Sequence, residues 1–210
     1  LMASAGDPFQ VSIENTVFTG NTGFDVLNLD QTFEIVGGQV SSNTMTGHCA
    51  IGIDGSGSSV ISGTEIMSNT SQAIIIWGPD NVVSAHNLTI QDNAGGVSNN
   101  GILTLTNSIV ENNSGDNASV IFSENFSETN RLVLDNCTIR DNSTPGIVSI
   151  STGYAALRNT RIMNNDSVHS IVNVGEGGTT PTVEMVNVLL ADNETRGQNT
   201  VFQSTGSATL

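Results

Sequence analysis

Short stretches of the chain alternate apolar with polar residues, which is the pattern of a β-strand with one buried face. Other stretches are short, mainly apolar runs that follow turns rich in glycine and serine. No stretch keeps the 3.6-residue apolar period of an amphipathic helix, so the sequence predicts an all-β protein of short strands. Alternating pairs include Val11 and Ile13, Leu103 and Leu105, Leu132 and Leu134, and Val183 and Met185, and mainly apolar runs include 50–53, 73–76, 147–150 and 170–174.

A three-position motif repeats eight times. It consists of an asparagine or glycine, an apolar residue three positions later, and an asparagine three positions after that. Successive motifs start 20 to 29 residues apart, and a period in this range indicates a solenoid. Two or three short strands in each repeat predict a parallel β-solenoid of about eight coils. The motifs are Asn15/Phe18/Asn21, Gly37/Val40/Asn43, Gly63/Ile66/Asn69, Asn87/Ile90/Asn93, Asn107/Val110/Asn113, Asn136/Ile139/Asn142, Asn159/Ile162/Asn165 and Asn187/Leu190/Asn193.

The two asparagine positions of the motif differ in kind. The first holds asparagine or glycine, which adopt the left-handed backbone conformation most easily, so we interpret it as a turn. The last is never glycine, which indicates a role for the side chain. In coils stacked about 4.8 Å apart, each amide can donate to one neighbour and accept from the other, although a row of metal or sugar ligands is an alternative. The predicted asparagine ladder comprises Asn21, Asn43, Asn69, Asn93, Asn113, Asn142, Asn165 and Asn193.

The repeats resemble those of a known family. Phe18-Thr19-Gly20-Asn21 matches the Phe-x-x-Asn signature of polymorphic outer-membrane proteins, and Gly95-Gly96-Val97 is close to their Gly-Gly-Ala-Ile signature. In the other motifs isoleucine, valine or leucine replaces the phenylalanine. From Val11 to about Phe202 the chain is similar to the right-handed parallel β-helices of the pectin-lyase-like superfamily. The resemblance implies a right-handed solenoid, which is also the usual hand of parallel crossovers.

The charge balance disfavours several kinds of partner. The 210 residues include twenty Asp and Glu, five Arg and no Lys, and the net charge is −15. Nucleic acids bind through basic patches, so we expect no nucleic-acid partner, and anionic membranes and polysaccharides are disfavoured for the same reason. An acidic surface without lysine suits a salty extracellular environment, although simple solubility explains it equally well.

We expect one β-helix domain over residues 1–210, with the repeats at 11–202. No apolar run reaches membrane-spanning length, so no membrane span is predicted. Ala3-Ser4-Ala5 fits the small-residue site at which signal peptides are cleaved, so residues 1–5 are a candidate remnant of one. Neither terminal repeat has an evident cap, which favours end-to-end self-association or continuation into a longer rod.

Nine asparagines lie in Asn-x-Ser/Thr sequences and are formal acceptors of N-linked glycans. Their place in the repeat separates them. Four belong to the predicted ladder, so we expect Asn69, Asn142, Asn165 and Asn193 to be unmodified. The five candidates for glycosylation are Asn117 and Asn125 in the longest stretch between motifs, Asn112 just before the ladder, and the turn residues Asn87 and Asn136.

The residue that precedes the ladder asparagine alternates between Asp and Asn, which spaces like charges about 10 Å apart on a solvated wall. A row of calcium ligands is the alternative, but calcium needs six to eight converging oxygens and a flat column does not converge. We therefore predict no cofactor and no metal site, with calcium as the one alternative. The same alignment predicts the ion pairs Glu111–Arg140 and Asp135–Arg158. The alternating residues are Asp92, Asn112, Asp141, Asn164 and Asp192.

The resemblance to the pectin-lyase-like superfamily raises the question of whether this chain has the catalytic residues of the enzymes in that superfamily. A lyase needs a basic proton abstractor and a hydrolase needs paired carboxylates facing one groove, but the chain has no Lys and no Asp-Asp pair. Cys49 and Cys137 are too far apart in a solenoid to form a disulfide. The isolated Trp77 and Tyr154 form no platform for sugars. We predict no catalytic residue, and we interpret His48, His86 and His169 as surface or strand residues.

These observations favour an extracellular, glycosylated β-helix that serves as a structural or adhesive element, alone or stacked into a filament. The alternative is a carbohydrate-active enzyme or a polysaccharide-binding module on the same fold. A groove lined by convergent carboxylates with flanking aromatic residues would favour the alternative, whereas flat walls would favour the structural role. Ice binding is a minor third interpretation, because only Thr104-Leu105-Thr106 has the Thr-x-Thr pattern.

Overall fold

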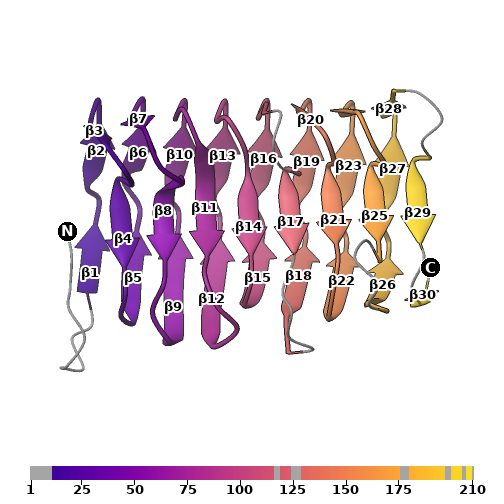
Figure 1. Cartoon of the computed structure of the whole chain (residues 1–210), viewed down its shortest axis with the longest axis horizontal. Coiled ribbons are helices and arrows are strands. Elements are labelled where there is room, and N and C mark those ends of the chain that lie inside the picture. The colour runs from indigo at the N-terminus through magenta and orange to yellow at the C-terminus, as the bar shows by residue number, and fades with distance from the viewer. Residues whose placement is uncertain are drawn as a thin grey trace.

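The structure is a computed structural model that describes residues 11–115, 119–123, 129–175, 180–196, 200–204 and 207–209. All the regular elements in these ranges are β-strands, which stack in parallel into a solenoid of about seven turns. Successive coils lie side by side along the long axis of the rod, with β1 (Val11–Glu14) at one end of it and β29 (Phe202–Ser204) at the other (Figure 1). The predicted all-β solenoid is confirmed, and the expected eight coils are close to the number observed.

Three long parallel sheets form the walls of the rod, and we call them sheets I, II and III. Sheet I contains β1 (Val11–Glu14), β5 (Phe33–Val36), β9 (Gly57–Ser62), β12 (Asn81–His86), β15 (Ile102–Thr106), β18 (Arg131–Asp135), β22 (Tyr154–Arg158), β26 (Thr182–Val186) and β30 (Ser207–Thr209). Sheet II contains β2 (Val17–Thr19), β6 (Gln39–Ser41), β10 (Glu65–Met67), β13 (Thr89–Gln91), β16 (Ile109–Glu111), β19 (Thr138–Arg140), β23 (Arg161–Met163) and β27 (Leu189–Ala191).

Sheet III closes the cross-section, and two small sheets lie between sheets II and III along the chain. Sheet III contains β4 (Leu27–Leu29), β8 (Cys49–Ile53), β11 (Gln72–Ile76), β14 (Val97–Asn99), β17 (Ile121–Ser123), β21 (Val148–Ile150), β25 (Val172–Val174) and β29 (Phe202–Ser204). The small sheets pair β3 (Thr22–Gly23) with β7 (Thr44–Met45), and β20 (Ser143–Thr144) with β24 (Asp166–Ser167) and β28 (Glu194–Thr195).

The coils are in register, so equivalent residues of the motif become vertical neighbours. Ile66 on β10, for example, pairs with Val40 on β6 and with Ile90 on β13. The apolar residue of the motif points inward and is fully buried in the interior coils. It joins inward-facing residues of sheets I and III in one continuous core. Burial of each such side chain stabilises the fold by about 1.5–3 kcal/mol.

Two corners of each coil are fixed by residues with positive φ. The first corner joins sheets I and II and holds the first residue of the motif, where all eight residues have φ between 46° and 65°. The second corner follows sheet II and holds the residue before the ladder asparagine, where φ lies between 51° and 67°. The Asp and Asn alternation, which we interpreted as charge spacing, therefore also meets a backbone requirement, because Asn, Asp and Gly adopt this conformation most readily.

The third corner, between sheets III and I, varies in length. It spans two residues between β14 and β15 and seven between β17 and β18. No fixed backbone conformation therefore repeats there, and side chains at this corner are not aligned by the motif. Glycine appears where coils approach closely: a Cβ at Gly55 would meet the carbonyl oxygen of Asp30 in the preceding coil.

Candidate functional site

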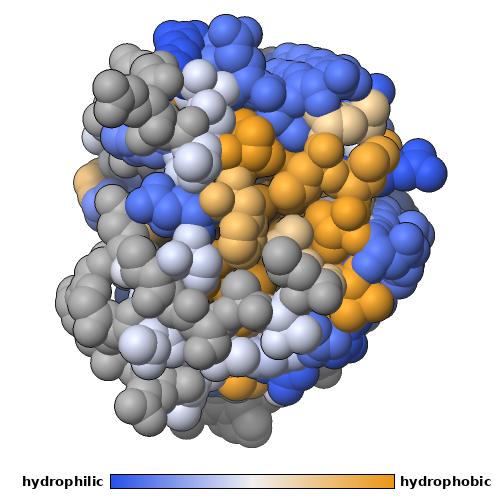
Figure 2. Space-filling view, turned by 90° about the vertical axis from the view of Figure 1, so that its right-hand side faces the viewer, coloured by the Kyte–Doolittle hydropathy of each residue, from blue (hydrophilic) through white to orange (hydrophobic). Residues whose placement is uncertain are grey.

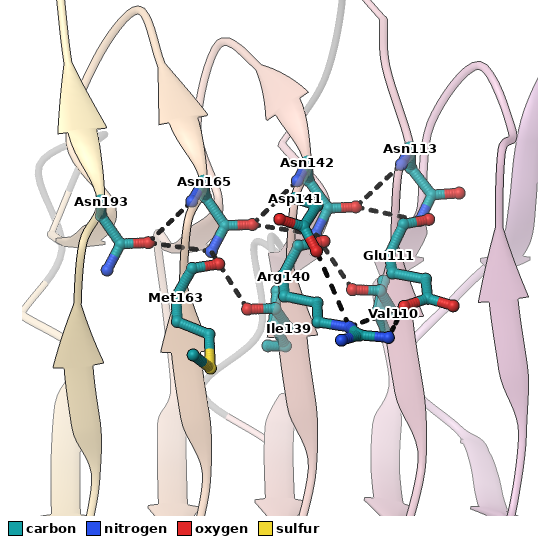
Figure 3. A network of polar contacts seen from close by, with 10 residues as sticks. All are labelled: Val110, Glu111, Asn113, Ile139, Arg140, Asp141, Asn142, Met163, Asn165 and Asn193. Carbon is teal, nitrogen blue, oxygen red and sulfur yellow. Dashed lines mark hydrogen bonds and ion pairs between the residues drawn. The ribbon is translucent and has the colours of Figure 1, made fainter.

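The asparagine ladder runs without interruption beside the second corner, and Figure 3 shows its part from Asn113 to Asn193. From Asn43 to Asn193, each Oδ1 accepts two hydrogen bonds from the preceding asparagine of the ladder. One comes from Nδ2 at 2.9–3.1 Å and the other from the backbone N–H at 2.9–3.2 Å. An amide oxygen has two acceptor positions, so these oxygens have none left for a metal ion or a sugar.

From Asn43 onward, each ladder amide also donates to a carbonyl oxygen in the coil before it. Asn69 Nδ2 donates to the carbonyl oxygen of Val40 at 2.9 Å, and Asn142 Nδ2 donates to that of Val110 at 3.0 Å. An interior asparagine therefore links three coils, and the six from Asn43 to Asn165 are buried. Full hydrogen bonding of these buried amides avoids a cost of about 1–3 kcal/mol for each unsatisfied group.

The ladder has chemically different ends. Asn21 is exposed, and its Oδ1 accepts no hydrogen bond from the part of the chain that the structure describes. Asn193 is half-buried, and its backbone N–H has no acceptor among the described residues. The first coil thus offers a free acceptor, and the last coil offers free donors.

The candidate glycosylation sites separate by exposure. Asn87, Asn112 and Asn136 have exposed side chains. Asn117 and Asn125 lie outside the described residues. The ladder residues that also lie in acceptor sequences are less accessible: Asn69, Asn142 and Asn165 are buried and Asn193 is half-buried.

One predicted ion pair is present and the other is wrong. Arg140 binds Glu111, with its Nε 2.7 Å from Oε2, as the register of β19 and β16 places them (Figure 3). Arg158 does not bind Asp135, its neighbour in the preceding coil; it donates instead to Glu184 on β26 at 3.2 Å. The carboxylate of Asp135 accepts from the Nδ2 of Asn159 at 2.9 Å.

Glu184 is the centre of a polar cluster on the outer face of sheet I. Besides the bond from Arg158, it accepts the hydroxyl hydrogen of Tyr154 at 2.7 Å. The bond from Tyr154, followed by that from Arg158, lowers the pKa of Glu184, and the same carboxylate raises the pKa of Tyr154. Arg131 lies over the ring of Tyr154, 5.2 Å from its centroid. The cluster joins β18, β22 and β26 on the surface.

Three aromatic side chains from successive coils meet outside the core. The ring of His48 lies 4.8 Å from that of Phe24 and 5.2 Å from that of Trp77, both in edge-to-face contact. Beside Trp77, at the third corner, is a hollow of about 570 Å³ lined in part by Asp30, Asp54 and Asp80. Carboxylates and an indole on one surface can bind sugar hydroxyls and the apolar face of a pyranose.

The other histidines lie in different surroundings. His86 Nδ1 is 3.3 Å from the Nδ2 of Asn87, and His169 lines a hollow of about 270 Å³ with the Asp166–Arg196 ion pair. Among the described residues, no three His, Cys, Asp or Glu side chains gather in a way that could hold a metal ion. That part of the chain also contains no apolar helix of membrane-crossing length.

Both cysteines are buried and unpaired. Burial, together with the charge of Asp25, raises the pKa of Cys49 well above its usual range, and burial raises that of Cys137 to about 11. Cys137 lies in one column with Ser108 and Thr160, and all three side chains contact the carbonyl oxygen two residues earlier. These thiols are therefore packing groups and not nucleophiles.

Comparison of the chain with protein-family models, curated proteins and solved structures returned no match.

The motif spacing led to the ladder residues but not to the hollow beside Trp77, because its aspartates come from the third corner, where spacing varies. A column alignment anchored on the ends of sheet III would have placed Asp30 beside Asp54, since Leu29 pairs with Ile53.

Proposed function

We propose that this chain is a structural or adhesive element of the cell exterior that carries N-linked glycans and extends head to tail, through further copies or further coils, into a longer rod. The same proposal includes that the solenoid is right-handed and that it is related to the pectin-lyase-like β-helices. The parallel, in-register sheets support both parts. The observation that carries the proposal is the complementarity of the two ladder ends. Within the described part of the chain, Asn21 has a free acceptor and Asn193 has free donors, and these match the bonds made between every pair of interior coils.

The end surfaces support the same association. Figure 2 shows an apolar area in the middle of the C-terminal end of the rod. The last coils carry the exposed Val186 and Val201 and the partly buried Leu190. At the other end Val17 is 59% exposed and Phe18 is only partly buried. The last strand of sheet II, β27, and the first, β2, both have one edge unpaired among the described strands, and such edges bind further strands readily.

Charge is distributed along the rod in a way that favours one polarity of stacking. All five arginines lie between residues 131 and 196, whereas thirteen of the twenty Asp and Glu precede residue 131. Electrostatic repulsion is therefore weaker when the C-terminal end of one copy contacts the acidic N-terminal half of another than when two N-terminal halves contact each other.

The test compares two substitutions of the same kind in the chain secreted from a eukaryotic host. Asn21→Lys replaces the free acceptor with a cation that has donors only, and stacking would bury it against the donors of Asn193, so we expect association to weaken by about tenfold or more. Asn164→Lys adds the same charge at an exposed side-wall position, and it should leave association unchanged. Sedimentation over a range of concentrations and electron microscopy give the readout. A monodisperse monomer at high concentration would show that the rod does not assemble.

Polysaccharide binding is a second candidate function because the hollow beside Trp77 has the carboxylates and the aromatic neighbour that it requires. Binding of neutral oligosaccharides by calorimetry, lost in Trp77→Ala and kept in Tyr154→Ala, would establish it. No heat of binding with any neutral oligosaccharide would eliminate it.

A further inference from the structure

A polar groove follows the first corner through three successive coils near the C-terminal end. Its volume is about 590 Å³, and Asn136, Thr138, Asn159, Arg161 and Asn187 supply its amide, hydroxyl and guanidinium groups. Val188 and Leu189 add an apolar patch, and Leu189 is 49% exposed. The groove thus combines hydrogen-bond donors and acceptors with a small apolar surface, which is the composition that binds amphipathic ligands such as sugars.

Arg161 is an unusual residue in this acidic chain. The other four arginines are engaged: Arg140 with Glu111, Arg158 with Glu184, Arg196 with Asp166, and Arg131 with the ring of Tyr154. Arg161 is exposed and forms no ion pair with any residue that the structure describes. Its donors are therefore available to a ligand in the groove.

Asn136 lies at the head of the groove and begins the acceptor sequence Asn136-Cys137-Thr138. Its side chain is exposed, and its Nδ2 donates to the Oδ1 of Asn107 in the preceding coil at 2.7 Å. Attachment of a glycan replaces only one of the two hydrogens of Nδ2, so this bond can persist. The groove extends from Asn136 in the opposite direction, toward Asn159 and Asn187.

From this arrangement we infer that the groove holds the first N-acetylglucosamine residues of a glycan attached to Asn136. The guanidinium of Arg161 donates to the sugar hydroxyls or the acetamide oxygen, and Leu189 contacts the acetamide methyl group. The amides of Asn159 and Asn187, which are already joined by a hydrogen bond of 2.9 Å, form the polar wall. The inference rests on the proposed glycosylation and specifies which glycan is bound to the protein surface.

Asn87 is the matched control for Asn136. It occupies the same position of the motif, has positive φ, is exposed and lies in an acceptor sequence, but it does not line the groove. The protein is secreted from a eukaryotic host, site occupancy is measured by mass spectrometry, and peptide N-glycosidase then acts on the folded protein. We expect release from Asn136 to be slower than release from Asn87 by about tenfold, the effect of one hydrogen bond to a charged donor. After denaturation the two rates should be equal.

Two substitutions separate the groove from general effects of folding. Arg161→Gln should bring the release rate at Asn136 close to that at Asn87, whereas Arg140→Gln, on the same sheet but outside the groove, should not. Leu189→Ala is a second, milder variant with the same expected direction. An NMR contact between the acetamide methyl group and Leu189 in the wild type would support the inference directly.

Different results distinguish the inference from the proposed function. Equal release at Asn136 and Asn87 in the folded protein overturns the inference, as does a glycan at Asn87 and Asn112 with none at Asn136. Either result leaves the proposed function in place. Absence of glycans from all three exposed sites would overturn the glycosylation part of the proposed function as well.

Discussion

Tyr154 on β22 donates its hydroxyl hydrogen to Oε2 of Glu184 on β26, at 2.7 Å. The bond requires a protonated tyrosine and an ionised glutamate, so it links the stability of two neighbouring coils to pH. The pKa of Tyr154 is raised and that of Glu184 is lowered. The contribution from Glu184 is present above the carboxyl's unfolded pKa and is lost as pH falls through the folded one. The contribution of Tyr154 to stability is present below the pKa of the phenol in the unfolded chain, and it is lost as pH rises through the pKa of Tyr154 in the folded protein.

Because Tyr154 is the only tyrosine in the chain, its ionisation can be followed directly by ultraviolet absorbance. We expect the folded protein to titrate above the ordinary value of about 10 and the urea-unfolded protein to titrate at it. Glu184→Gln should lower the midpoint in the folded state, since an amide carries no charge to oppose the tyrosinate. A folded midpoint equal to the unfolded one would contradict the hydrogen bond.

Loss of one interior ladder residue should destabilise the protein strongly. In Asn113→Leu the backbone N–H and Nδ2 of Asn93 both lose their acceptor in a buried site. We expect the free energy of unfolding to fall by about 3 kcal/mol, measured by urea denaturation. Asn21→Leu is the control, because the Oδ1 of Asn21 accepts nothing from the described residues, and it should cost less than about 1.5 kcal/mol. Equal losses at both positions would mean that the ladder bonds do not stabilise the interior.

Cys137 should be replaceable by serine at little cost. Its column already contains Ser108 and Thr160, and their hydroxyls donate to the carbonyl oxygen two residues earlier at 2.8 Å. We expect Cys137→Ser to change the free energy of unfolding by less than about 1 kcal/mol. Because burial raises the pKa of Cys137 to about 11, neither the rate nor the extent of its reaction with maleimide at pH 8 should be measurable before unfolding. Rapid labelling of the folded protein would contradict its burial.

Removal of residues 205–210 should strengthen head-to-tail association. Among the strands that the structure describes, sheet I has nine, one more than sheets II and III. In a head-to-tail pair, β2 of the second copy would pair with β27 of the first copy. The β1 strand of the second copy would then occupy the same level of sheet I as β30 of the first copy. Both strands cannot fit there, so one of them must be displaced. Sedimentation of the shortened chain should show larger assemblies at the same concentration. Weaker association would mean that β30 itself forms part of the contact.

The solenoid and the ladder were predictable because both depend on residues that repeat at nearly constant intervals. The inward position of Ile66, Ile90 and their equivalents follows from spacing alone. The partner of Arg158 was not predictable, because the alignment places Asp135 directly opposite Arg158 and Glu184 only diagonally. The long arginine side chain nevertheless reaches the diagonal carboxylate, which no alignment of columns shows. The hollow beside Trp77 was missed for a different reason, because the motif ends before the third corner. Asp54 and Asp80 each follow their ladder asparagine by 11 residues, but Asp30 follows its own by nine, so the three do not form one column of the motif.

The backbone bonds between coils all run along the axis of the rod, since the strands lie across it. A force applied to the two chain ends would therefore peel the terminal coils away one after another, and would not break the whole rod at once. Each coil would release 20 to 29 residues, or roughly 70–100 Å of extended chain, before the next coil yields. Anchored at a surface, such a molecule would lengthen stepwise under tension and limit the load that reaches whatever it holds.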